Sequence, residues 1–599
     1  MGGIAGIIDL NDNVKESSAY ILQAMSGVLN SKGYLEDSYI SEHAGLINRS
    51  NKNDMTKGIA YASTSAGNLY ITHDLRIYNT IDILNELRLK KELLPDCHDP
   101  ELFLYAFEVW GGRCLNKMNG DFAFAIWNET RKELFLGRDR LGVKPLYYTH
   151  IGNTFIFASE LKALLKHPLV KREIDTFGVI EELAFLHPSS SKTIIKNIHT
   201  LSPGHYLKYN GFDVRVTKYW DLQYRGCAET YDQCIERLQD LLIDAVRIRK
   251  VGLESFAVLL SGGLSSSGIA CLTNDSNRIS TYTLNFKTSI EGNTRHITNI
   301  IGDDLEYARA MSSEIHSNHH ELLLDLDENE YFKQLSSVTR YRDMPAASGS
   351  EVGRLLLFKE IKDQFPIVFS GDCSDYTFGR RIVCQSENSL DSYLKSLALY
   401  RLKPFSSILR HPFLYTRYLR QEHKNLIGTP FLWDNPKDKS INTLYYVLVK
   451  RELPYILDCI DKISNVSSVE VRLPFCDYRL FEYYFNLPAA YKSIRDSPGY
   501  LLRKVLSKYC PRDILSRPKS VFPYPASDED MDQLRMRVLR LLEFTRRKYS
   551  ILSKIIWFGV GERISDLSKR EKIPRHLLCT FMTNIISLDY LCNEYDLWV

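Results

Sequence analysis

Short apolar runs of strand length, separated by turn residues, fill the chain up to about residue 210. The run at residues 121–127 (DFAFAIW) follows an Asn-Gly pair, which is a typical turn signal. Further runs of this kind are residues 133–137, 146–148, 154–158 and 205–209. Strands at such close spacing predict antiparallel sheets packed face to face.

The pattern changes after residue 224. Residues 229–250 carry apolar side chains at helical spacing, and a fully apolar run at 256–260 follows them. A Ser/Gly-rich loop, a second helical stretch and another apolar run at 280–286 come next. This order predicts a βαβ unit, and hence a parallel sheet covered on both faces. We place a domain boundary between the two patterns, which gives a first domain over 1–222 and a second over 228–599.

Composition narrows the class of protein. The chain has 599 residues, of which 44% are hydrophobic and 25% charged, and this length predicts more than one domain. A net charge of +3 is too small to indicate a nucleic-acid partner. The start, MGGIAGIIDLND, does not resemble a secretory signal, and no apolar stretch is long enough to predict a membrane span. The twelve cysteines are scattered without a C-x-x-C pair, which is typical of buried thiols and favours a cytoplasmic location.

Residues 261–267 (SGGLSSS) form a candidate phosphate-binding loop, because they lie between an apolar strand and a helix. Two glycines let the backbone turn tightly and bring bare N–H groups toward an anion, and the helix N-terminus adds a favourable dipole. No Lys follows, so this is not the GxxxxGK[ST] loop. The alternative is a Gly/Ser turn that only caps the helix.

The loop resembles the pyrophosphate loop SGG-x-D-S of ATP-pyrophosphatase enzymes, in the form found in the asparagine synthetase family. The resemblance extends over most of the chain, through GDFAFAIWNETRKELFLGRDRLGVKPLYY, FIFASELKALLKHP and LSPGHYLKYN in the first domain and DDLEYARAM, FSGDCSDYTFG, VEVRLPFCDYRLFEYYFNLP and SRPKSVF in the second. It implies an α+β Ntn-type sandwich, with antiparallel sheets between helices, followed by an α/β ATP-pyrophosphatase domain with a parallel sheet and additional helices. The first domain is thereby expected to have a glutaminase fold.

The glutaminase residues of the family are missing. Glutamine-using members carry a nucleophilic Cys after the initial Met, and this chain has Gly2, which has no side chain to attack a substrate. The family's Asn-Gly pair of the oxyanion hole falls at Asp74-Leu75, and a carboxylate there repels a developing oxyanion. No HRGPD segment is present between Ser31 and Asp54. The resemblance therefore implies that the nitrogen does not come from glutamine.

Family members without this Cys include small-ring synthetases and lasso-peptide cyclases. Extra sequence at 387–442 and after residue 530 favours a larger substrate and hence the cyclase. The basic stretch at 534–543 has apolar residues at helical spacing, and we expect a solvated helix packed on its own domain, against the alternative of a surface that docks a partner or an acidic peptide. Such an enzyme adenylates an Asp or Glu side chain of a precursor peptide with ATP and Mg²⁺, and the peptide's own N-terminal amine closes the macrolactam. Expected partners are the precursor peptide and a leader-peptide protease. The alternatives are a small-molecule amide ligase, of the β-lactam synthetase or ammonia-dependent type, and a non-catalytic nucleotide- or peptide-binding relative.

The resemblance assigns roles to three charged residues. Asp375 matches the Asp that holds Mg²⁺ between the phosphates, although an Asp here could also cap a helix. Lys519 matches a Lys that contacts pyrophosphate and the adenylate, against the alternative of a surface Lys. Asp372 lies where a carboxylate accepts a proton from the incoming amine, against the alternative of a turn-forming Asp. The expected ATP-binding residues are Leu260, Ser261, Gly262, Gly263, Ser265, Ser266, Leu284, Ser370 and Gly371.

One residue departs from the motif. Ser265 occupies the position of the Asp in SGG-x-D-S that helps to bind Mg²⁺, and a hydroxyl is a weaker ligand. Either a nearby carboxylate, Asp303 or Asp304, replaces it, or the chain turns over slowly or only binds its ligands.

Overall fold

The structure is a computed structural model of the chain. It describes residues 2–30, 34–51, 58–65, 67–87, 99–183, 191–274, 278–286, 304–345, 349–379, 436–492, 499–517, 528–546 and 575–598.

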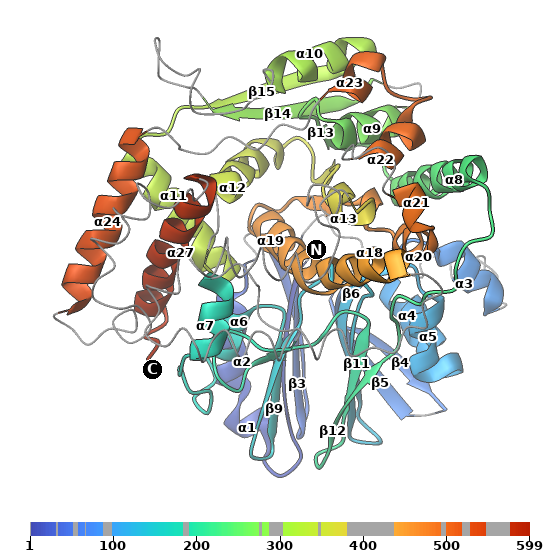
Figure 1. Cartoon of the computed structure of the whole chain (residues 1–599). Helices are drawn as coiled ribbons and strands as arrows, with labels where there is room; N and C mark the ends of the chain where they lie inside the picture. Colours follow the sequence, from blue (N-terminus) through green and yellow to red (C-terminus); the bar gives the residue numbers. More distant parts are fainter. Residues whose placement is uncertain are drawn as a thin grey trace.

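The first half of the chain forms two six-stranded antiparallel sheets, seen in the lower part of Figure 1. The first sheet has the order β10 (His199–Thr200), β8 (Tyr147–Ile151), β9 (Thr154–Ala158), β1 (Gly2–Asp9), β3 (Ala44–Asn51), β2 (Tyr34–Ile40). The second has the order β12 (Val214–Lys218), β11 (His205–Tyr209), β7 (Glu133–Arg138), β6 (Gly120–Asn128), β5 (Gly67–Ile77), β4 (Ala60–Thr64). Buried side chains from both sheets, including Ile4, Trp127 and Phe155, meet in one core. The predicted face-to-face packing is confirmed.

Helices cover the outer faces of both sheets. On the first sheet, α2 (Ala19–Val28) and α6 (Leu161–Leu164) share a core with β1 and β9. On the second, α3 (Thr80–Glu86), α4 (Asp99–Trp110) and α5 (Cys114–Lys117) share a core with β5 and β6. The smaller helices α1 (Val14–Ser17) and α7 (Thr176–Leu183) flank the first sheet. Two antiparallel sheets between helices make up the Ntn-type sandwich that the sequence predicts.

The second half contains a five-stranded sheet in which every pair of neighbours is parallel. Its order is β15 (Asn318–Leu324), β14 (Ser280–Phe286), β13 (Ala257–Leu259), β16 (Ile367–Phe369), β17 (Glu470–Arg472). Its first helices are α8 (Tyr231–Lys250), α9 (Leu264–Thr273), α10 (Asp304–Glu314), α11 (Glu328–Arg342) and α12 (Gly349–Ile361). The predicted α/β domain with a parallel sheet is confirmed.

Further helices complete this half and connect it to the sandwich. They are α13 (Ser374–Thr377), α18 (Pro436–Val447), a π-helical turn (Leu448–Glu452), α19 (Leu453–Val466), α20 (Tyr478–Asn486), α21 (Ala489–Lys492), α22 (Tyr500–Leu506), α23 (Arg512–Ser516), α24 (Asp528–Arg546) and α27 (Arg575–Glu594). The basic stretch at 534–543 lies in α24, which packs against α27. Its Leu534 and Val538 are buried, so this helix packs on its own domain, as expected.

The two halves share packed surfaces. One apolar cluster joins α2 and α6 of the sandwich to α11, α12, α19 and α27 of the second half. Residues 219–230, between β12 and α8, form neither helix nor strand, and the predicted boundary at 222–228 falls within them. Among the described residues, no helix is both long and apolar enough to cross a membrane.

Candidate active site

The predicted nucleotide-binding residues gather where the order of the parallel sheet reverses. In chain order the five strands run 3-2-1-4-5 across the sheet, so the chain leaves β13 in one direction and later enters β16 on the other side. Ligands of open α/β sheets bind at such a switch point, beyond the carboxyl ends of the strands. The loop after β13 begins at Ser261 and the loop after β16 begins at Ser370, so both lie at this edge.

The loop after β13 is a tight turn into α9. Gly262 has a φ of +66°, and a Cβ there would lie 2.5 Å from the backbone nitrogen of Ala308, so only glycine fits. The backbone N–H of Ser261 donates to Ser266 Oγ at 3.2 Å, and Ser266 Oγ donates to the Gly263 carbonyl at 3.0 Å. These serine contacts hold the turn in shape at the N-terminus of α9, where an anion is favoured.

The loop after β16 lies directly against this turn. A Cβ on Gly371 would be 2.6 Å from the backbone nitrogen of Ser266, which shows how closely the two loops approach. The Ser265 and Ser374 hydroxyls are 2.5 Å apart. The structure therefore brings Ser265 next to the short helix α13 that carries Asp375. Cys373, at the start of α13, has a φ of +70°, a backbone conformation that is strained for a residue with a side chain.

Two further predicted residues lie at the same edge. Leu260 donates its N–H to the Tyr282 carbonyl at 2.8 Å and accepts at its own carbonyl from the Thr283 hydroxyl, so its backbone is bonded to β14. Leu284 lies on β14 two positions beyond Tyr282, which is the residue that pairs with the end of β13. Both positions therefore border the loop that begins at Ser261.

Asp372 is held by an arginine that the sequence did not indicate. Arg354, on α12, lies 2.7 Å from the Asp372 carboxylate, and the Ser370 hydroxyl donates to the same oxygen at 2.6 Å. Burial alone would raise the pKa of Asp372, but the charge and hydrogen bond of Arg354 outweigh it and hold the pKa below its usual range. A lowered pKa weakens a carboxylate as a proton acceptor, so Arg354 works against the base role assigned to Asp372, which stays a prediction.

A second arginine that the sequence did not indicate, Arg517, contacts the loop after β13. The Arg517 side chain is only 2% exposed and donates to the Ser261 carbonyl at 3.3 Å. It also forms an ion pair with Asp304 and stacks over the Tyr307 ring at 4.1 Å. Asp304 is therefore paired with Arg517. This ion pair would compete with Mg²⁺ for the Asp304 carboxylate, which the sequence offers as a substitute for the motif Asp that Ser265 replaces. Lys519 and Asp303 lie outside the described residues, and their roles stay predictions.

The position of the family nucleophile is closed by backbone. Gly2 lies in β1 opposite Ser50 of β3, and a Cβ on Gly2 would be 1.9 Å from the Arg49 carbonyl oxygen. No side chain fits there in this sheet.

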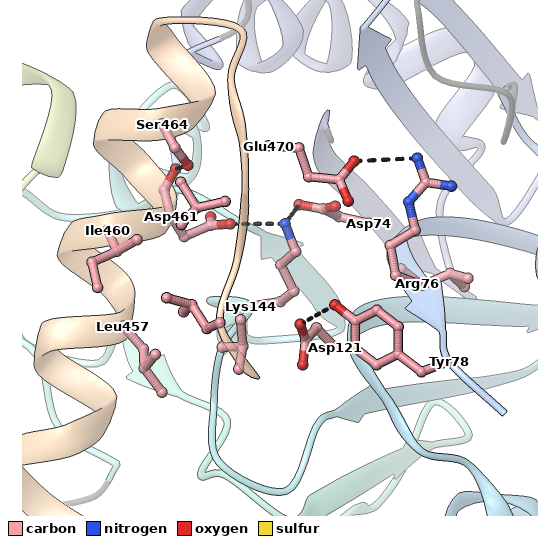
Figure 2. Close-up of a pocket in the computed structure, with 14 residues that line it drawn as sticks. Asp74, Arg76, Tyr78, Asp121, Lys144, Leu457, Ile460, Asp461, Ser464 and Glu470 are labelled. Atoms are coloured by element: carbon pink, nitrogen blue, oxygen red, sulfur yellow. Dashed lines mark hydrogen bonds and ion pairs between the residues drawn. The ribbon is translucent and has the colours of Figure 1, made fainter. Parts of the chain in front are cut away.

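The residue in the oxyanion-hole position takes part in an ion pair between the halves. Lys144 Nζ lies 3.0 Å from the Asp74 carboxylate of β5 and 2.8 Å from the Asp461 carboxylate of α19 (Figure 2). All three side chains are buried. Burial raises the pKa of Asp461 to about 7. The positive charge of Lys144 partly opposes this rise, and the negative charge of Asp74 adds to it. The carboxylate of Asp74 is thus engaged in holding the sandwich to α19.

These residues line a small polar cavity between the two halves. The cavity has room for a water molecule. Two more pairs lie along it, Arg76 with Glu470 at 3.3 Å and Tyr78 with Asp121 at 2.6 Å (Figure 2). Charged and hydrogen-bonded pairs therefore lie beside apolar side chains along the contact between the sandwich and the second half.

Comparison with known proteins matches both halves of the chain. The family model described as asparagine synthase matches residues 237–555, and the glutamine amidotransferase domain model matches residues 1–220. Asparagine synthetase [glutamine-hydrolyzing] 3 of Bacillus subtilis (strain 168) is 29% identical over 544 residues, which cover 88% of this chain and 87% of that protein. Asparagine synthetase [glutamine-hydrolyzing] 1 of the same organism is 24% identical and covers 84% of each chain. Amidase chyE of Penicillium rubens is 24% identical and covers 78% of each.

Proposed function

The chain belongs to the asparagine synthetase family of ATP-dependent amide-forming ligases, and we propose that it is a macrolactam synthetase, a lasso-peptide cyclase, that acts on a precursor peptide. An Asp or Glu side chain of the peptide attacks the α-phosphate of ATP, which gives an acyl-adenylate and releases pyrophosphate. The N-terminal amine of the same peptide then attacks the acyl carbon, AMP leaves, and one proton is lost as the amide forms. A leader-peptide protease is the expected source of the free amine.

Gly2 is the observation that carries this proposal. Two of the relatives are named as glutamine-hydrolysing, yet here the nucleophile position has no side chain and a Cβ would meet the Arg49 carbonyl. With no thiol to release ammonia from glutamine, the acceptor nitrogen is either free ammonia or an amine that the substrate itself carries, and we favour the second. An amine and a carboxyl group on one peptide satisfy that requirement, and holding both in reach supplies about 7–11 kcal/mol through effective molarity.

The described loops fit ATP and Mg²⁺ as ligands. The turn at Gly262 and Gly263 ends at the N-terminus of α9, which is suited to phosphate oxygens. Asp375 would supply a hard oxygen ligand for Mg²⁺ beside that turn, and an ion held there would neutralise charge on the leaving pyrophosphate. Asp372, which Arg354 orients, is the carboxylate that we propose to contact the incoming amine.

The experiment incubates the purified chain with ATP, Mg²⁺ and a leader-free precursor peptide. Loss of one water from the peptide, with equal amounts of AMP and pyrophosphate, supports the cyclase. AMP release only with a small amino acid or with ammonia instead supports a small-molecule ligase. Asp375→Ala is expected to abolish AMP formation, whereas Asp240→Ala, exposed on α8, is expected to leave it unchanged. Unchanged turnover in Asp375→Ala refutes the metal role of Asp375.

Ser265 favours a second candidate, a relative that binds nucleotide without turnover. Its hydroxyl is bonded to Ser374, so the loop offers Mg²⁺ no carboxylate at this position. Ser265→Asp restores the motif and is expected to lower the Mg²⁺ concentration that gives half-maximal AMP formation, with Ser265→Ala as the control. Nucleotide binding without AMP formation in every variant, Ser265→Asp included, identifies the chain as a binding protein.

A further inference from the structure

Three metal-binding side chains meet where the chain passes from the sandwich to the second half. Cys227 and Glu229 lie in the segment before α8, and Cys234 lies in the first turns of that helix. The two sulfur atoms are 3.7 Å apart, and Cys227 Sγ is 3.8 Å from Glu229 Oε2. Within the part of the chain that the structure describes, this is the one group of three such donors whose ligand atoms all lie within 4.8 Å of one another.

Two of the three separations between these atoms match the edges of a zinc tetrahedron, and the third, between Cys234 Sγ and the Glu229 carboxylate, is at most 4.8 Å. With Zn–S near 2.3 Å and Zn–O near 2.1 Å, two sulfur ligands lie about 3.8 Å apart, and a sulfur and an oxygen lie about 3.6 Å apart. The observed sulfur–sulfur separation of 3.7 Å and sulfur–oxygen separation of 3.8 Å are close to the respective values. We propose that Cys227, Glu229 and Cys234 bind a zinc-type divalent metal ion, with the fourth position left to water.

Neighbouring groups hold the three donors in place. Thr230, between Glu229 and the helix, forms a capping box with Gln233, which fixes the first turn of α8. The Tyr483 hydroxyl, from α20, donates to the Glu229 carboxylate. Such a contact to a metal ligand orients it and supports affinity. The positive end of the α8 dipole lies beside the donors and favours their negative charge.

The segment that carries Cys227 is itself tied to α20. Asn486 Oδ1 accepts from the Arg225 backbone N–H at 2.5 Å, and Asn486 Nδ2 donates to the Gln223 carbonyl at 3.1 Å. Glu229 is exposed and Cys227 is half-buried, which leaves a path for the ion to enter. Binding releases the protons of the two thiols to solvent. A metal ion here would join the segment before α8 to that helix, at the junction of the regions matched at 1–220 and 237–555.

The test uses the full chain, expressed with added zinc and purified with a reducing agent and without chelator. Metal analysis by mass spectrometry is expected to find one zinc per chain, and Cys227→Ser and Cys234→Ser are expected to lose it. The matched control is Cys271→Ser with Cys510→Ser, because these sulfurs are also close, at 3.9 Å. Zinc lost equally in the control and in the site variants overturns the proposal.

Cobalt gives a second measurement that does not depend on the cysteine variants folding. Co²⁺ titrated into the zinc-free chain is expected to give a near-ultraviolet thiolate-to-metal band. Tyr483→Phe keeps all three donors and is expected to weaken the affinity roughly 10–100-fold. A chain that binds no zinc and no cobalt when reduced, and forms a Cys227–Cys234 disulfide when oxidised, contradicts the proposal and identifies a redox pair instead.

Discussion

Lys144 of the sandwich and Asp461 of α19 form a 2.8 Å ion pair that is buried between the two halves of the chain. The same lysine holds Asp74, the residue that falls where the family resemblance expects an oxyanion-hole pair. One cation thus joins two carboxylates from opposite sides of the interface. The residue at the predicted oxyanion-hole position is therefore part of the contact that fixes the sandwich to the second half.

Lys144→Met is expected to destabilise the chain strongly. It leaves Asp74 and Asp461 buried together without a cation, and losing one partner of a buried pair costs about 3–5 kcal/mol. The midpoint of urea unfolding measures the loss. Lys117→Met removes a pair with Glu86 whose side chains are 39% and 48% exposed, so it is expected to cost less than about 1 kcal/mol. Equal midpoints for the two variants contradict a structural role for the Lys144 pairs.

The raised pKa of Asp461 predicts a pH-dependent stability. Its pKa is about 7 in the folded chain against an ordinary 3.8, so the folded state binds an extra proton between these values. This contribution to stability is present below about pH 4 and is lost as the pH rises through 7. Asp461→Asn removes that loss while Asp74 still pairs with Lys144. The unfolding temperature of Asp461→Asn, relative to the unsubstituted chain, is therefore expected to rise from pH 5 to pH 8.

Asp240→Asn, on the exposed face of α8, is the control for this measurement. It is expected to change the unfolding temperature equally at both pH values. If the unfolding temperature of Asp461→Asn also differs from that of the unsubstituted chain by the same amount at pH 5 and pH 8, the titrating group is a residue other than Asp461.

Local sequence patterns predicted the elements well because each element depends on nearby residues. The apolar runs at 154–158, 205–209 and 280–286 coincide with β9, β11 and β14. The helix expected over 229–250 begins at residue 231, since Thr230 caps it. The family resemblance, more than any local pattern, predicted that the loops after β13 and β16 carry the nucleotide-binding residues.

The charged contacts of the site depend on residues that are far apart in sequence. Lys144 and Asp461 are 317 positions apart, and Arg517 and Asp304 are 213 apart, so no spacing rule connects them. Arg354 lies only 18 positions before Asp372, but on a different element. Three different packing contacts bring these groups together: the two halves for Lys144 and Asp461, α10 and the end of α23 for Asp304 and Arg517, and α12 and the loop after β16 for Arg354 and Asp372. Cys227 and Cys234 are only seven positions apart, but this spacing is not a C-x-x-C pair, so the sequence did not indicate their contact.

Gly2→Cys is expected not to restore glutamine hydrolysis. The new Cβ would meet the Arg49 carbonyl at 1.9 Å, so β1 has to shift away from β3 and the core beneath it loosens. Release of glutamate from glutamine is expected to stay at background, and the unfolding temperature is expected to fall. Gly27→Ala, where a Cβ meets nothing within 4 Å, is expected to be tolerated. Glutamine turnover in Gly2→Cys would falsify the view that backbone closes this position.

Arg354→Gln tests what the arginine does to Asp372. Without the guanidinium, burial dominates and the pKa of Asp372 rises from its lowered value. If the ionised carboxylate takes part in amide formation, the acid limb of the rate against pH moves to higher pH, while the rate at alkaline pH changes less. Asp372→Asn is expected to remove that limb, with a lower rate at every pH. An acid limb that stays in place in Arg354→Gln means that Asp372 serves only to hold the loop after β16, because the pair then contributes structure and no proton transfer.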